Sequence, residues 1–208
     1  MAIVFRMAAG LLGWFALALQ YGLVMSGDFN TGAITRTINF FSYFTILTNI
    51  LAALALTLPM TLPQLAFGQF FSWPTVRTAI TAYIIIVMTI VYFVLRHLTT
   101  LQGWDLVADV ILHYVMPVLF VIDWLFFVPK ETLKAKDGLV WLAFPVVFLI
   151  WTFIQGAYSG FYPYPFLNVG ELGLTRVLLN EAGLLVIFLI LGLALVTGVR
   201  LFDKRLSP

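Results

Sequence analysis

Residues 79–91 read AITAYIIIVMTIV and residues 184–196 read LLVIFLILGLALV. Neither run contains a charged residue or the alternation of apolar and polar positions that marks the strands of a membrane barrel. Uncharged, continuous runs of this kind are typical of helices that cross a bilayer, each of which needs about 20 predominantly apolar residues. These two stretches predict an all-α membrane protein.

The composition of the whole chain supports this prediction. Its 208 residues are 62% hydrophobic and 10% charged, and the mean hydropathy is +1.06. Soluble domains are about 45–50% apolar and about 25% charged. The composition therefore excludes a soluble globular enzyme, a nucleic-acid-binding domain and a disordered tail. The absence of cysteine also excludes disulfides, thiolate metal sites and a cysteine nucleophile.

Six long apolar stretches, separated by glycine, proline or charged residues, occupy nearly the whole chain. We expect a single domain over residues 1–208, a polytopic bundle with helices at about residues 3–25, 38–60, 75–95, 106–128, 139–158 and 177–199. The first stretch is too long for the apolar region of a signal peptide, so we expect it to be retained as a helix.

The distribution of lysine and arginine predicts the orientation of the bundle. Six spans leave both termini on one side of the membrane, together with eight basic residues: Arg6, Arg77, Lys130, Lys134, Lys136, Arg200, Lys204 and Arg205. The opposite side holds three: Arg36, Arg96 and Arg176. Because cytoplasmic loops carry the excess of positive charge, we expect both termini to be cytoplasmic.

The fourth predicted span carries the densest group of ionisable residues. Asp105, Asp109 and His113 follow one another at steps of four, which puts them on one face of a helix. Ionisable side chains inside a membrane are costly and mark candidate functional sites, although Asp109 and His113 could also simply neutralise each other. Asp123, beside Trp124 near the cytoplasmic end, is interpreted as an interfacial anchor.

The second predicted span carries a stripe of small polar residues at spacings of three and four: Ser42, Thr45, Thr48 and Asn49. Such stripes usually pack helices closely. Thr45 and His113 each lie about seven residues from the outer end of their span, or ~10 Å deep. A hydroxyl and an imidazole at one depth, with the Asp109 carboxylate one turn away, are the parts of a nucleophile, a base and a residue that orients the base.

The outer loop before the sixth span and the start of that span supply further candidates. Tyr164, Pro165 and Phe166 lie in a segment where two prolines disfavour helix and favour an extended turn. This segment either forms a structural lid or admits an acyl chain. Arg176 is a candidate to hold a carboxylate or a lipid headgroup, and Asn180 lies one turn further along.

Several reaction classes lack their motifs here. The sequence has no HExxH, no paired histidine ligands, no glycine-rich phosphate loop and no GxSxG, so we expect no metal and no cofactor. Backbone amides inside regular helices are already hydrogen-bonded, so the side chains of Asn49, Asn180 or Ser42 would have to stabilise an oxyanion.

At these residues the sequence resembles the prokaryotic branch of the androgen-induced and androgen-dependent TFPI-regulating family of six-helix membrane proteins. The resemblance is carried by SYFTILTN at residues 42–49, HYVMP at residues 113–117, DW at residues 123–124 and YPFL at residues 164–167. It covers most of the chain, and YPFL is its most specific element.

The resemblance implies an activity, because animal members of that family are intramembrane threonine hydrolases that cleave fatty acid esters of hydroxy fatty acids. Carried over, their pattern identifies Thr45 as the nucleophile and His113 as the base. It implies a long-chain lipid as substrate and, for the prokaryotic branch, a multi-pass protein of the bacterial cytoplasmic membrane. The depths of Thr45 and His113 predict an active site toward the outer half, and the composition predicts no nucleic-acid partner. The oligomeric state stays open.

Two other functions remain compatible with the sequence. In a proton-coupled carrier of small molecules, Asp105, Asp109, His113 and Glu181 would relay protons while Thr45 only packs. In a noncatalytic lipid-binding protein, the polar stripe would only pack helices. Substitutions separate these hypotheses, because a carrier depends on Asp109 and a hydrolase depends on Thr45.

Overall fold

The computed structural model describes residues 1–27, 31–98 and 100–206, with side chains described as far as residue 198. Within these ranges the secondary structure is helical, and no strand is present. Six helices are long and apolar enough to cross a membrane: Ala2–Ser26, Phe44–Thr61, Pro74–Leu95, Gly103–Phe127, Asp137–Ser159 and Leu174–Gly198. The prediction of an all-α protein with six candidate membrane spans is confirmed. The orientation of the termini stays a prediction.

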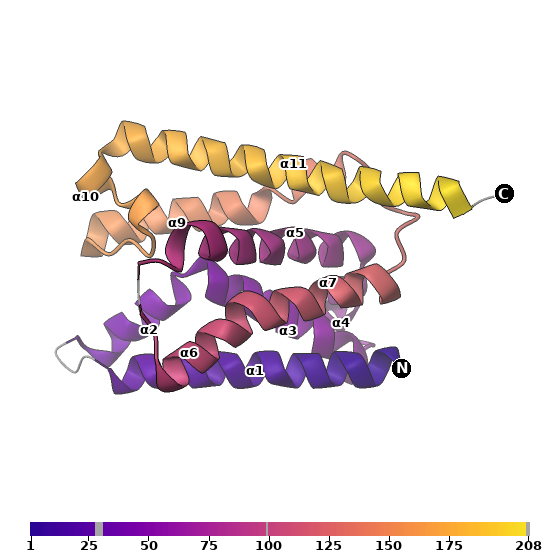
Figure 1. The fold of residues 1–208 in the computed structure, drawn as a ribbon, viewed down its shortest axis with the longest axis horizontal. Coiled ribbons are helices and arrows are strands. Elements are labelled where there is room, and N and C mark those ends of the chain that lie inside the picture. Colours follow the sequence, from indigo (N-terminus) through magenta and orange to yellow (C-terminus); the bar gives the residue numbers. More distant parts are fainter. Residues whose placement is uncertain (28–30, 99, 207–208) are drawn as a thin grey trace. The chain divides into compact units, whose positions relative to one another are not determined.

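The chain divides into two compact units, residues 1–129 and residues 130–208. The first contains α1 (Ala2–Ser26), α2 (Ala33–Phe41), α3 (Phe44–Thr61), α4 (Ala66–Ser72), α5 (Pro74–Ile90), η1 (Val91–Leu95), α6 (Gly103–Val110), η2 (Ile111–Val115) and α7 (Met116–Phe127) (Figure 1). The second contains α8 (Asp137–Val140), α9 (Ala143–Ser159), η3 (Pro165–Leu167), α10 (Val169–Leu172) and α11 (Leu174–Leu206). That the chain forms a single domain stays a prediction.

Small residues bring the helices of the first unit close together. A Cβ atom added at Gly10 of α1 would lie 2.5 Å from Cγ2 of Thr57 on α3, and one at Gly13 would lie 2.7 Å from Cε of Met116 on α7. Ala52 of α3 is fully buried in the same core. Close helix contacts through small residues are characteristic of membrane bundles, where backbone approach increases van der Waals contact.

The second predicted span begins later than expected, and its start is corrected from residue 38 to Phe44. The chain leaves α2 at Ser42, where the Ser42 and Tyr43 amides donate to the carbonyls of Asn39 and Phe40, three residues back instead of four. The Ser42 hydroxyl donates to the carbonyl of Ile38 at 2.8 Å. Tyr43 is then extended, with φ −86° and ψ 127°. Thr45 therefore lies in the first turn of α3, and not seven residues inside a longer helix. The other predicted ends lie within three residues of the observed spans.

The fourth span is one continuous helix with a π turn, η2, in its middle. The Met116 amide donates to the carbonyl of Ile111, five residues back. Pro117 follows, and it has no N–H to donate to the preceding turn. The wider turn before proline contains His113. Single π turns within α-helices occur frequently at functional sites.

Candidate functional site

The carboxylate of Asp109 holds the imidazole of His113 in one orientation. Nδ1 of His113 lies 2.7 Å from Oδ1 of Asp109 and 3.1 Å from the Asp109 carbonyl oxygen. An ionised carboxylate accepts hydrogen bonds only, so this contact favours the neutral tautomer of His113 in which Nδ1 carries the proton and Nε2 is the acceptor. Both side chains are partly buried. The spacing of four residues predicted this pair, whose geometry fits both a base with an orienting carboxylate and a pair of side chains that neutralise each other.

Asp105, the third ionisable residue of this helix face, differs from the partly buried pair in its exposure to solvent. It is exposed, and it stands in the first turn of α6. A carboxylate there interacts favourably with the positive end of the helix dipole, which accounts for it as a helix-terminal charge.

Asn49 joins the first turn of α3 to the π turn. The Asn49 side chain is fully buried, and Nδ2 donates to the carbonyls of Thr45 at 2.9 Å and Leu112 at 3.1 Å. In a π turn each carbonyl accepts a hydrogen bond from the amide five residues on, which for Leu112 is residue 117, a proline without an N–H. The Asn49 amide therefore supplies a hydrogen bond that Pro117 cannot. The second and fourth spans are in contact here, which the sequence alone did not show.

Thr45 lies at the beginning of α3, directly after the extended residue Tyr43. Its side chain is buried, and its carbonyl accepts from the Asn49 amide that also holds Leu112, the neighbour of His113. The N-terminus of an α-helix carries a partial positive charge from its aligned peptide dipoles. The predicted nucleophile thus stands at the positive end of α3, on the turn that Asn49 ties to η2.

The side chains expected to stabilise an oxyanion are engaged elsewhere. Both amide protons of Asn49 are donated to backbone carbonyls, and the Ser42 hydroxyl donates to Ile38. In the second unit, Nδ2 of Asn180 donates to the carbonyl of Phe166 at 2.9 Å. These three residues therefore act as ties between backbone segments in this structure.

The loop before α11 is a short 3₁₀ turn rather than the extended turn expected from its prolines. The turn η3 begins at Pro165, where proline is tolerated because the first helical residue needs no N–H donor. The rings of Tyr164 and Phe166 stack at 5.3 Å with 2° between their planes. Asn180 fastens this turn to α11, whereas Arg176 is exposed on the same helix. The loop is a fastened element of the second unit.

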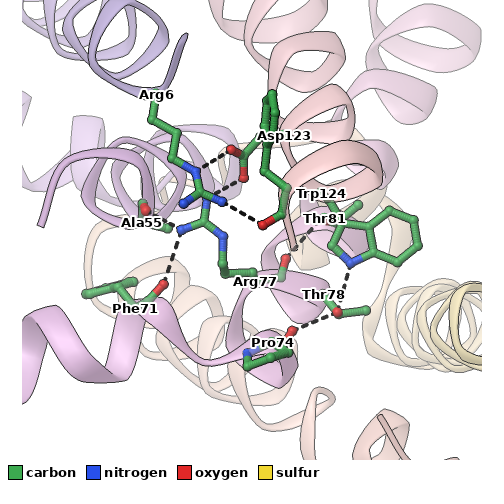
Figure 2. Close-up of polar contacts among 10 residues, drawn as sticks. Arg6, Ala55, Phe71, Pro74, Arg77, Thr78, Thr81, Asp123 and Trp124 are labelled. Atoms are coloured by element: carbon green, nitrogen blue, oxygen red, sulfur yellow. Dashed lines mark hydrogen bonds and ion pairs between the residues drawn. The ribbon is translucent and has the colours of Figure 1, made fainter. Parts of the chain in front are cut away.

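An ion cluster that the sequence analysis did not anticipate lies within the first unit. It consists of Arg6 of α1, Arg77 of α5 and Asp123 of α7, and we call it the Arg–Asp cluster (Figure 2). Oδ1 of Asp123 accepts from Nε of Arg6 at 2.6 Å, and Oδ2 accepts from Nη2 of Arg77. Asp123 is fully buried and Arg77 nearly so. The interpretation of Asp123 as an interfacial anchor is therefore wrong.

Further hydrogen bonds fix the Arg–Asp cluster to the surrounding helices. Nη1 of Arg77 donates to the carbonyls of Ala55 and Phe71 (Figure 2). Nη2 of Arg6 donates to the carbonyl of Phe127. Removing one partner of a buried ion pair typically lowers the free energy of unfolding by about 3–5 kcal/mol, because the remaining charge stays buried without its partner. The cluster thus connects α1, α3, α4, α5 and α7 into one unit.

A signal in the sequence could have revealed this cluster. Arg6 and Arg77 were counted as topological charges of the cytoplasmic side, although each lies within an apolar stretch. Arg6, Arg77 and Asp123 all fall about one turn from the same expected side of the membrane. Opposite charges at one depth on different spans are candidates to pair.

Comparisons with known proteins add no family or fold neighbour. No protein-family model matches the chain, and neither the curated proteins nor the solved structures contain a match. The resemblance noted from the sequence stays a prediction. Among the described residues, no group of three or more histidine, aspartate and glutamate side chains could hold a metal ion. Six long apolar helices and an internal ion cluster indicate the class: a multi-pass helical membrane protein.

Proposed function

We propose that this protein is an intramembrane hydrolase that cleaves esters of long-chain lipids, with Thr45 as nucleophile and His113 as base. The observation that carries the proposal is the 2.7 Å contact between Nδ1 of His113 and Oδ1 of Asp109. It leaves Nε2 as the acceptor, which is the atom that a general base uses in a triad. The buried Asn49 amide, which ties the Thr45 turn to the π turn, supports the pairing.

The proposed reaction has two halves. Oγ1 of Thr45 attacks the ester carbonyl while Nε2 of His113 takes the hydroxyl proton, and the leaving alcohol then receives that proton as its C–O bond breaks. Water attacks the resulting acyl-threonine in the same way, which releases the fatty acid and restores Thr45. Asp109 stabilises the imidazolium form of His113 in both halves.

The start of α3 offers a source of oxyanion stabilisation that differs from the side chains first considered. The tetrahedral intermediate would form on Thr45, within the first turn of the helix. The positive end of the α3 dipole stabilises negative charge that develops there. A nucleophile at a helix N-terminus therefore does not depend on the protons of Asn49, Ser42 or Asn180.

The substrate class follows from the resemblance and from the apolar surroundings. We propose a fatty acid ester of a hydroxy fatty acid, or a similar long-chain ester, which reaches the site laterally from the bilayer without a cofactor. Tyr164, Pro165 and Phe166 would guide the acyl chain, and Arg176 would bind a carboxylate. The proposal includes a bacterial cytoplasmic membrane, cytoplasmic termini and an active site in the outer half.

Ester hydrolysis by the detergent-purified protein tests this proposal. A branched fatty acid ester and a chromogenic acyl ester should be turned over by the wild type, and turnover should fall to background in Thr45→Ala and His113→Ala. Thr61→Ala is the matched control, because Thr61 is an exposed threonine at the other end of α3. A fluorophosphonate adduct should map to Thr45. Activity that survives Thr45→Ala would refute the proposal.

One observation favours a second candidate, the proton-coupled carrier. Glu181 is buried within α11, and its Oε1 has no hydrogen-bond partner among the described residues. Ionisable groups at such positions often relay protons. A carrier would lose transport in Asp109→Asn and Glu181→Gln and tolerate Thr45→Ala, which is the opposite ranking to that of the hydrolase.

A further inference from the structure

The Arg–Asp cluster holds more positive than negative charge. Two guanidinium groups share the single carboxylate of Asp123, which leaves one net positive charge within the cluster. Nε of Arg77 is buried and has no hydrogen-bond partner among the described residues. In a low-dielectric surrounding, an uncompensated charge is costly and favours the approach of a counter-ion.

Arg6 is the member of the cluster that an outside anion can reach. Its side chain is 20% exposed, whereas the side chains of Arg77 and Asp123 are 2% and 0% exposed. Nε and Nη2 of Arg6 donate within the protein, but Nη1 has no hydrogen-bond partner among the described residues. The guanidinium also lies over the ring of Phe127, 5.9 Å from its centre. Arg6 is therefore held in place by two hydrogen bonds, while both N–H donors of Nη1 are left to spare.

Exposed aromatic side chains surround this end of the first unit. Phe70 and Trp73 precede α5, close in sequence to the Phe71 carbonyl that Arg77 binds, and Phe126 precedes the Phe127 carbonyl that Arg6 binds. All three are exposed. Tryptophan concentrates at the level of lipid headgroups, so Trp73 indicates that the cluster lies near a membrane interface, and the two phenylalanines offer apolar surface beside it.

We propose that Arg6 binds the phosphate of an anionic phospholipid in the leaflet that surrounds the N-terminal end of α1. The two Nη1 protons of Arg6 would donate to phosphate oxygens, a pairing that guanidinium groups form strongly. A lipid with one net negative charge neutralises the net positive charge of the cluster. This proposal does not depend on the hydrolase reaction.

The charge balance selects the kind of lipid. A zwitterionic headgroup carries a phosphate and a cationic amine, so it brings no net charge to the cluster. Free inorganic phosphate brings charge but lacks acyl chains, which would pack against the exposed aromatic residues and add apolar burial. Of the three sources of phosphate, an anionic phospholipid satisfies both the charge and the surroundings.

Thermal unfolding of the detergent-purified protein tests the proposal directly. With phosphatidylglycerol at ten times its Kd, Tm should rise by about 3–6 °C. Equal concentrations of phosphatidylcholine or inorganic phosphate should leave Tm unchanged. High salt should diminish the rise, because Arg6 is partly exposed and its interaction is screened. If phosphatidylcholine raised the Tm of the wild-type protein as much as phosphatidylglycerol does, the proposal would be overturned.

Two variants and a control assign the effect to Arg6. Arg6→Gln should lose the phosphatidylglycerol-dependent rise, and Arg6→Lys should keep part of it because the cation remains. Arg96→Gln is the matched control, since Arg96 is an exposed arginine at the far end of the same long span as Arg77. A full rise in Arg6→Gln, or its loss in Arg96→Gln, would show that the lipid binds elsewhere. If Arg6→Gln does not fold, native mass spectrometry of Arg6→Lys and Arg96→Gln decides, with fewer bound phosphatidylglycerol molecules expected only in Arg6→Lys.

Discussion

Asp123→Asn should be the most destabilising conservative change in the first unit. The asparagine keeps the size of the side chain but removes the negative charge that Arg6 and Arg77 share. It also turns an amide group toward guanidinium donors. Arg77 is then left as a buried cation, since its other bonds go to the neutral carbonyls of Ala55 and Phe71.

The magnitude of this effect follows from burial. The pair with Arg77 is almost completely buried, so its disruption should lower the free energy of unfolding by about 3–5 kcal/mol. The pair with Arg6 is partly exposed and should add only about 0–1 kcal/mol. For a chain of this length, each kcal/mol corresponds to about 2–4 °C, so a combined loss of about 3–6 kcal/mol should lower Tm by about 6–24 °C.

Thermal unfolding in detergent micelles, followed by circular dichroism and tryptophan fluorescence, measures this effect. The double variant Arg77→Met/Asp123→Leu should lose much less stability than the sum of the losses in Arg77→Met and Asp123→Leu. The two fully buried charges are then removed together, and Arg6, which loses its carboxylate, is partly exposed. Arg96→Gln should stay within about 0.5 kcal/mol of the wild type, as exposed substitutions do. A loss below about 1 kcal/mol in Asp123→Asn, or additive losses in the double variant, would refute the reasoning.

Three further substitutions test the site and the packing around it. Asn49→Leu should lower the free energy of unfolding by about 1–3 kcal/mol, measured by thermal unfolding, because it leaves a buried carbonyl without its donor. Pro117→Ala should restore an N–H donor but leaves the number of residues in the helix unchanged, so the π turn should stay and both thermal stability and ester hydrolysis should change little; a large loss of turnover would contradict this. Gly10→Val should lower Tm, since its Cβ would lie 2.5 Å from Thr57; an unchanged Tm would show that α1 and α3 can separate without loss.

The spans were predictable because each depends mainly on the hydropathy of a continuous stretch. The break at Ser42 and Tyr43 was not, because it depends on the Ser42 and Tyr43 amides donating to carbonyls three residues back, and hydropathy does not report this. The apolar run continues across the break, so the second span was extended back to residue 38. A local hydrogen bond thus decided the helix boundary.

The candidate site was predictable only where its residues lie on one helix. The contact of Asp109 with His113 follows from their spacing of four residues. The bridge from Asn49 to Leu112 joins residues 63 positions apart, so no local pattern indicates it. The ion pair of Arg77 with Asp123 joins residues 46 positions apart, and counting Arg77 only among the basic residues of the cytoplasmic side concealed it further.

The π turn also affects how this chain aligns with other sequences. A π turn contains one residue more than the α-helical turn it replaces. The turn at residues 111–115 is therefore equivalent to a regular helix into which one residue has been inserted. Deletion of one residue there would return the helix to α geometry, while α6 and α7 would keep their present faces. A homologue without this turn would therefore need a gap of one position between Val110 and Met116. Without that gap, each residue of α6 would be aligned with a residue one position away in the homologue, which lies on a different face of the helix.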